Sequence, residues 1–278
     1  MAEEARRAPN DIRPSLTDEE VLEFCKTGIL RLEGVISEST NRWVFDYLDR
    51  ENADPHDLVR DEYFIDEVLL HPAVAGVIRT LLGAQFQLPD WMANHRLVGP
   101  VEASYWHIDA GSNFERACNL LQVFYIPQAN TPEMGPTLFL PGSHLVPIAR
   151  EDVERFGSLA GQQMTAAPAG SVFVTAYSIW HRQPPKADCS TRNLLKWVYW
   201  RTEQPERDWV ADPNFDFGGA DYTHSSDYFH GPARMWQSVP RVAEMFYWLC
   251  GKTDEFHMVG GAGWPYSSTD PGFRADLP

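Results

Sequence analysis

The feature that most constrains the fold is a change in pattern at Gly83, after which short apolar runs alternate with Pro and Gly. The runs cover 119–126, 137–140, 171–176 and 194–200. Short apolar runs bounded by turn residues are typical of buried β-strands. Their spacing predicts a mainly β fold of the sandwich or jelly-roll type.

The residues before this region are predicted to be mainly helical. Thr17 and Glu20 form a capping-box pattern, which predicts a helix that ends at Gly28 and is followed by a strand over 29–32. The two further helices expected here cover 37–48 and 71–82.

The C-terminal part has apolar residues at helical spacing over 239–250, followed by a Gly-rich tail, and 151–156 resembles a helical insertion. A chain of 278 residues with 44% hydrophobic content can bury one sizeable core. We therefore expect a single domain over 1–278. Its parts are a helical support (1–83), a jelly-roll core (84–204), and C-terminal loops with a helix (205–278).

Composition excludes several classes of partner. The 23 basic and 39 acidic residues give a formal charge of −16, which would repel nucleic acid and anionic membranes. The first twenty residues lack the apolar segment of a signal peptide, and no run reaches the roughly 18 apolar residues of a membrane span. The four cysteines show no C-x-x-C pair, so we expect reduced thiols. A cytoplasmic monomer or homodimer is expected.

A possible metal site begins with His107 and Asp109. The alternation around them is typical of a strand, on which residues two apart project from one face. The H-x-D pattern also occurs by chance, so it needs a third ligand. His181 is the candidate, because it follows the apolar run 171–177 and precedes two prolines.

Two imidazoles and one carboxylate make a facial triad, which leaves three positions of an octahedral iron(II) for a 2-oxo acid and dioxygen. Arg192 lies at the start of the last run and has a planar fork suited to a carboxylate. Alone, Arg192 would be interpreted as a surface cation. Together with the triad, it is interpreted as the binding residue for the 5-carboxylate of 2-oxoglutarate.

At this point the chain resembles the phytanoyl-CoA dioxygenase family, whose pattern is H-x-D, then G-x-L-x-x-x-P-G-S-H, then a distal His and an Arg. This sequence has His107-Ile-Asp109, then Gly135-Pro-Thr-Leu-Phe-Leu-Pro-Gly-Ser-His144, then His181 and Arg192. The similarity extends over roughly 16–200. It departs from the family at Ser171, where many relatives have Asp, and at Gln183, where they often have a small hydroxyl residue.

The resemblance implies a double-stranded β-helix of the cupin-like jelly-roll type with flanking helices. It implies Fe(II) held by His107, Asp109 and His181, with 2-oxoglutarate and O2 as co-substrates. Thr137 and Gln122 are further expected contacts to 2-oxoglutarate. The implied reaction oxidises a C–H bond, with hydroxylation as the default and release of succinate and CO2. Asp109 disfavours halogenation, because halogenating relatives have Gly or Ala there.

The substrate is expected to be a small-molecule metabolite of natural-product biosynthesis. Aromatic residues are dense near the predicted site, and we expect about half of them to line an apolar pocket. They are Trp91, Tyr105, Tyr177, Trp180, Trp197, Tyr199 and Trp200. His95 and Arg96 are possible polar contacts, and the other histidines receive no role. Two alternatives stay open: a non-catalytic metal-binding subunit, and a cupin-like metalloenzyme that does not use 2-oxoglutarate.

Overall fold

The computed structural model of the chain describes residues 6–112, 117–222, 232–252, 256–259 and 264–267. The helical elements are α1 (Asp18–Thr27), α2 (Glu38–Leu48), η1 (Pro55–Arg60), α3 (Glu62–Phe64), η2 (Ile65–Leu69), α4 (Pro72–Leu82), η3 (Pro132–Met134), η4 (Ser143–Leu145), α5 (Arg150–Val153) and α6 (Pro232–Leu249). The strands are β1 (Ile29–Leu32), β2 (Ala93–Asn94), β3 (Leu97–Val98), β4 (Leu120–Ile126), β5 (Leu138–Phe139), β6 (Gln163–Met164), β7 (Ser171–Ala176), β8 (His181–Arg182), β9 (Thr191–Arg192), β10 (Leu195–Trp200), β11 (Phe256–Val259) and β12 (Trp264–Ser267).

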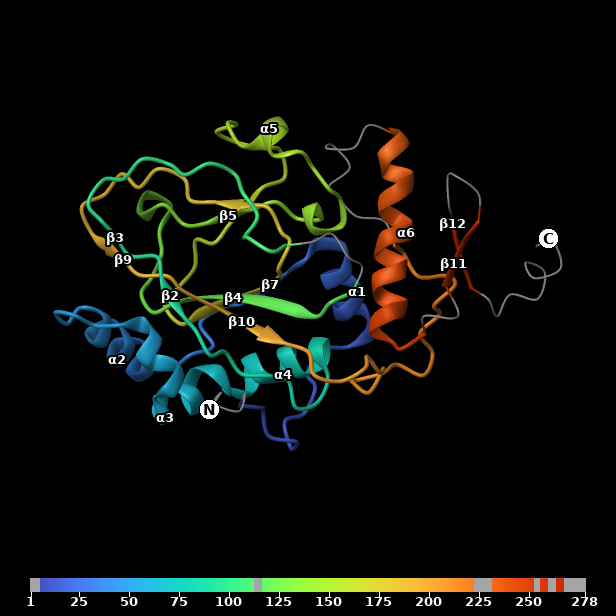
Figure 1. Cartoon of the computed structure of the whole chain (residues 1–278), viewed down its shortest axis with the longest axis horizontal. Coiled ribbons are helices and arrows are strands. Elements are labelled where there is room, and N and C mark those ends of the chain that lie inside the picture. The colour runs from blue at the N-terminus through green and yellow to red at the C-terminus, as the bar shows by residue number, and fades with distance from the viewer. Residues whose placement is uncertain (1–5, 113–116, 223–231, 253–255, 260–263, 268–278) are drawn as a thin grey trace.

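Five antiparallel strands form the large sheet, in the order β1-β7-β4-β10-β2. On β10, Leu195, Trp197 and Tyr199 are buried in the main hydrophobic cluster, which includes the helices. Figure 1 shows α2, α3 and α4 along this side of the sheet. Because a strand alternates, Lys196 and Val198 face the other way.

A three-stranded sheet, β6-β5-β8, faces the inner side of the large sheet. Phe124 of β4 packs against Phe139 of β5 with ring centroids 4.9 Å apart, and Phe173 of β7 joins the same cluster. The two sheets therefore enclose a core between them. The predicted jelly roll, mainly β with flanking helices, is confirmed.

The helix ends predicted from the N-terminal sequence agree with the structure. Thr17 and Glu20 form the predicted capping box of α1, and Gly28 ends the helix in the left-handed region. Ser37 caps α2, and His71 caps α4. The predictions did not include the short helical turns η1, α3 and η2. Each of these is six residues or shorter, too short for apolar periodicity to identify.

Three predicted elements differ in the structure. The segment 104–109 is not a regular strand, because its pairing is limited to one β-bridge between His107 and His181. His181 does not end the preceding strand, since β7 ends at Ala176 and β8 is a separate strand in the other sheet. Arg192 lies on β9, which precedes β10 and pairs with β3.

The C-terminal region contains the predicted helix, α6, and a two-stranded sheet of β11 and β12 that was not predicted. The remaining parts of the Gly-rich tail, 260–263 and 268–278, lie outside the described residues. No helix within the described part of the chain combines the length and apolar content that crossing a membrane requires.

Gly28, at the end of α1, packs against the Pro-Gly-Ser-His turn. Its φ is +71°, and a Cβ atom at this position would lie 2.5 Å from Nδ1 of His144, a buried ring. We expect Gly28→Ala to lower the free energy of unfolding by about 2–4 kcal/mol, the sum of left-handed strain and overpacking. Urea denaturation measures the change.

Gly99 supplies the control, because its φ is +69° and nothing lies within 4 Å of the corresponding Cβ position. Gly99→Ala should cost only the backbone strain, about 1 kcal/mol. Equal losses in Gly28→Ala and Gly99→Ala would show that the contact with the His144 ring is not responsible.

Candidate metal centre

The structure brings His107 and His181 side by side. Their backbones form both hydrogen bonds of the bridge, with N to O distances of 3.0 and 2.9 Å, and their ring centroids are 4.4 Å apart. The neighbouring Trp106 and Trp180 are buried together in a cluster with Leu138 of β5. Because side chains alternate along extended backbone, burying these two tryptophans turns both imidazoles toward the opposite side.

Each imidazole is oriented by a backbone carbonyl two residues earlier. Nδ1 of His107 lies 2.9 Å from the Tyr105 carbonyl oxygen, and Nδ1 of His181 lies 3.0 Å from that of Ile179. A carbonyl only accepts hydrogen bonds, so Nδ1 carries the proton and Nε2 keeps its lone pair. Metal-binding histidines are typically oriented in this way.

Asp109 completes the group. Its Oδ1 lies 3.8 Å from Nε2 of His181, and one ligand atom from each of His107, Asp109 and His181 lies within 4.8 Å of the others. Three atoms that bind one ion at about 2.1 Å in cis positions are about 3 Å apart. Small side-chain movements would therefore bring the three atoms to the separation that one ion requires, and the donor set fits a divalent transition metal. Among the described residues, this is the one such group.

The protonation states also suit a metal. Burial, followed by the neighbouring His107 and Lys196, holds the pKa of His181 well below its usual value, so the ring is neutral at pH 7. Burial alone would raise the pKa of Asp109. The charge of Lys196 and the hydrogen bonds from Lys196 and Gln122 oppose this effect, and the pKa is lowered, so the carboxylate is ionised.

A cavity of about 280 Å³ opens beside His107 and His181, and Arg192 and Thr137 are among its lining residues. Arg192 is 1% exposed, and its Nη1 donates to the Gly135 carbonyl oxygen at 2.7 Å. Burial lowers its pKa to about 10, so it stays charged at pH 7. No carboxylate of the described residues pairs with it, and its Nε has no hydrogen-bond partner there. The cavity thus contains a buried cation for which the described part of the chain provides no anion.

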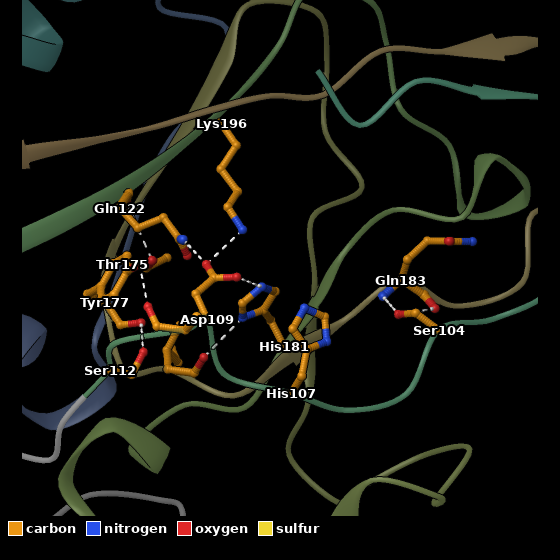
Figure 2. A network of polar contacts seen from close by, with 12 residues as sticks. Ser104, His107, Asp109, Ser112, Gln122, Thr175, Tyr177, His181, Gln183 and Lys196 are labelled. Atoms are coloured by element: carbon orange, nitrogen blue, oxygen red, sulfur yellow. Dashed lines mark hydrogen bonds and ion pairs between the residues drawn. The ribbon is translucent and has the colours of Figure 1, made fainter. Parts of the chain in front are cut away.

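Gln122, an expected contact to 2-oxoglutarate, donates its amide N–H to Oδ2 of Asp109. Lys196, which sequence reasoning missed, donates to the same oxygen at 2.7 Å (Figure 2). The available signal was a lysine between two apolar residues, Leu195 and Trp197, of a predicted strand.

The expectation of an aromatic pocket was wrong. Trp180, Trp197 and Tyr199 are buried in hydrophobic clusters, whereas Trp91 and Tyr105 are 57% and 63% exposed. None of the seven aromatic residues named above is among the described residues that line the cavity. Apart from the histidines, Phe124 is the aromatic residue found there, and His95 and Arg96 line it as the sequence suggested.

No protein-family model and no curated protein matches the sequence. Solved structures nevertheless share its fold. HygX from Streptomyces hygroscopicus, with nickel and 2-oxoglutarate bound, is 19% identical, covers 70% of this chain and 92% of its own, and has a TM-score of 0.57. EctD from S. alaskensis is 17% identical, with coverages of 75% and 88% and a TM-score of 0.53.

A third structure, the non-haem α-ketoglutarate-dependent epimerase SnoN from nogalamycin biosynthesis, is 16% identical. It covers 66% of this chain and 83% of its own, with a TM-score of 0.52. The chain therefore has the jelly-roll fold of these three proteins.

Proposed function

We propose that the protein is a Fe(II)- and 2-oxoglutarate-dependent oxygenase of the phytanoyl-CoA dioxygenase family. The observation that carries the proposal is the buried Arg192 cation, which lines the same cavity as His107 and His181 and has no carboxylate partner among the described residues. A ligand that binds both a metal and this cation needs chelating oxygens at one end and a carboxylate at the other. 2-Oxoglutarate has both, and the HygX structure with nickel and 2-oxoglutarate bound supports this choice.

In this proposal His107, Asp109 and His181 hold the iron, and their number leaves three positions for the co-substrate and dioxygen. Bound iron supplies the activation of dioxygen that drives the oxidation. Arg192 binds the distal carboxylate of 2-oxoglutarate, and Thr137, which also lines the cavity, is a further contact. The chain's contribution is to orient the reactants and exclude water.

The substrate is proposed to be a small-molecule metabolite, and its hydroxylation is coupled to release of succinate and CO2. Two of the similar structures support a natural-product substrate: SnoN is from nogalamycin biosynthesis, and another HygX structure has hygromycin B bound. Polar side chains among the lining residues, such as Arg96, Ser104 and Gln183, would offer hydrogen bonds to such a substrate.

Anaerobic calorimetry tests the proposal with a matched pair of ligands. 2-Oxoglutarate and glutarate both carry two carboxylates, but glutarate lacks the 2-oxo group that chelates a metal. On protein loaded with Mn(II), we expect 2-oxoglutarate to bind at least roughly tenfold tighter than glutarate. Glutarate lacks the contact between the 2-oxo group and the metal, and a loss of about 1.4 kcal/mol already corresponds to a factor of ten in the dissociation constant. Without metal, the difference should disappear.

Equal binding of the two ligands to the Mn(II) protein would overturn the proposal and favour a cupin-like metalloenzyme with another substrate. Binding of 2-oxoglutarate without turnover of any screened metabolite would favour a non-catalytic metal-binding subunit. Succinate release distinguishes the latter case.

A further inference from the structure

We propose that Lys196 is a positioning residue of the metal centre. Together with Gln122 it holds Oδ2 of Asp109, so that the carboxylate binds the ion through Oδ1 alone. This inference rests on the proposed metal site, but it concerns how the protein leaves coordination positions of the ion open to other ligands.

Lys196 and Gln122 reach Asp109 from adjacent strands of the large sheet. In the pairing of β4 with β10, Lys196 lies opposite Phe124, and Val198 lies opposite Gln122. Directly opposed residues share a face, and so do residues two apart on a strand. Lys196 and Gln122 are therefore diagonal neighbours on the inner face of the sheet.

Both donors reach the same carboxylate oxygen. Nζ of Lys196 lies 2.7 Å from Oδ2 of Asp109, and the Gln122 amide donates to that oxygen too. Oδ1 instead faces Nε2 of His181 at 3.8 Å. Figure 2 shows Lys196 and Gln122 on one side of the carboxylate and both imidazoles on the other.

This arrangement gives the two oxygens different roles. Oδ2 accepts two hydrogen bonds, one of them from a cation, so its lone pairs are largely engaged and it is a poor second ligand. Oδ1 has no hydrogen-bond donor among the described residues and points toward the proposed ion. A carboxylate held in this way occupies one position on the metal, whereas a carboxylate free to bind through both oxygens would occupy two.

The burial of Lys196 indicates that its ion pair with Asp109 has a specific role. The Lys196 side chain is 12% exposed and its ammonium lies 5.6 Å from the centre of the Phe124 ring. Burying an ammonium group is costly, and Asp109 is the charged partner the described residues provide. An apolar residue at this inner position would pack at lower cost, so the lysine contributes orientation rather than fold stability.

The test counts the water molecules bound to Mn(II) in the loaded protein, from the line broadening of its electron paramagnetic resonance spectrum in 17O-enriched water. A six-coordinate ion with three single-atom protein ligands binds about three waters, and a two-oxygen carboxylate leaves about two. We expect the wild type to show the higher number and Lys196→Met the lower. Lys196→Arg, which restores the cation, should recover the wild-type number.

Lys26→Met is the matched control, because the Lys26 side chain is 15% exposed and its ion pair with Glu23 lies on α1. It should leave the number of bound waters unchanged. If Lys196→Met does not fold, Lys196→Gln removes the same charge with a smaller change in polarity, and the same loss of one water is expected.

The outcomes separate this inference from the proposed function. If the wild type and Lys196→Met bind Mn(II) with the same number of waters, the role of Lys196 is overturned and the metal site stands. If the wild type binds no Mn(II), the metal site itself is overturned, and the positioning role falls with it.

Discussion

His181→Ala is expected to abolish stoichiometric binding of Fe(II). His181 supplies one of only three proposed ligand atoms, and its ring is buried and oriented by the Ile179 carbonyl. Loss of an outer partner of a ligand typically costs about 10–100-fold in metal affinity, so loss of the ligand itself should cost more than about 100-fold. Anaerobic equilibrium dialysis followed by metal analysis measures this change.

His95→Ala is the matched control for this substitution. His95 lines the same cavity, and burial followed by the nearby Lys196 and Arg192 lowers its pKa to about 4, so it is also a neutral imidazole. It does not belong to the group of three ligand atoms. Fe(II) affinity should therefore stay within a few-fold of wild type. Equal losses in the two variants would contradict the assignment of His181.

Arg192→Met is expected to remove most of the affinity for 2-oxoglutarate while Fe(II) still binds. Truncating one partner of a buried, hydrogen-bonded charge pair costs about 2–5 kcal/mol, so the dissociation constant should rise by at least roughly 30-fold. Anaerobic calorimetry on the metal-loaded variant gives this constant. Arg192→Lys should recover only part of the affinity, because an ammonium lacks the planar fork.

In the absence of 2-oxoglutarate, Arg192→Met should not lower the folding stability of the protein. The buried Arg192 has no carboxylate partner among the described residues, and burying a charge without such a partner costs folding free energy that an apolar side chain would not cost. We therefore expect Arg192→Met to unfold at the wild-type temperature or above. A large loss of stability together with retained 2-oxoglutarate binding would show that Arg192 is structural.

Several parts of the fold were predictable because their signals are local. The capping box at Thr17 and the glycine at position 28 determine the ends of α1. The long strands β4 and β7 follow from continuous apolar runs, because each is buried on both faces. In β10, alternate residues are fully buried, which is the pattern of a strand with one face in the main core. The proximity of His107 and Asp109 was predictable for a different reason, since residues two apart needed only an extended backbone to share a side.

Other features depend on contacts between distant segments. His181 belongs to the small sheet because β8 pairs with β5, and nothing in the run 171–177 indicates where one sheet ends and the other begins. The aromatic residues gave a wrong expectation because strand alternation alone does not identify the side that faces the cavity. Trp197 and Tyr199 face the helices.

The net charge of the whole chain does not describe the cavity. The formal charge is −16, yet the cavity is lined by Arg96, Arg182, Arg192 and Lys196, with no acidic side chain among its described lining residues. Net charge averages over the surface, whereas the potential at a site depends on the few groups that face it. A cationic cavity in an acidic protein agrees with a dianionic co-substrate.

If one cavity binds both iron and 2-oxoglutarate, the anaerobic complex should have a characteristic visible spectrum. Chelation of Fe(II) by the 2-oxo acid produces a weak metal-to-ligand charge-transfer band. We expect this band in the wild type, its loss in His181→Ala, and its loss or weakening in Arg192→Met at the same 2-oxoglutarate concentration. A wild-type protein that binds Fe(II) but forms no band with 2-oxoglutarate would contradict the account.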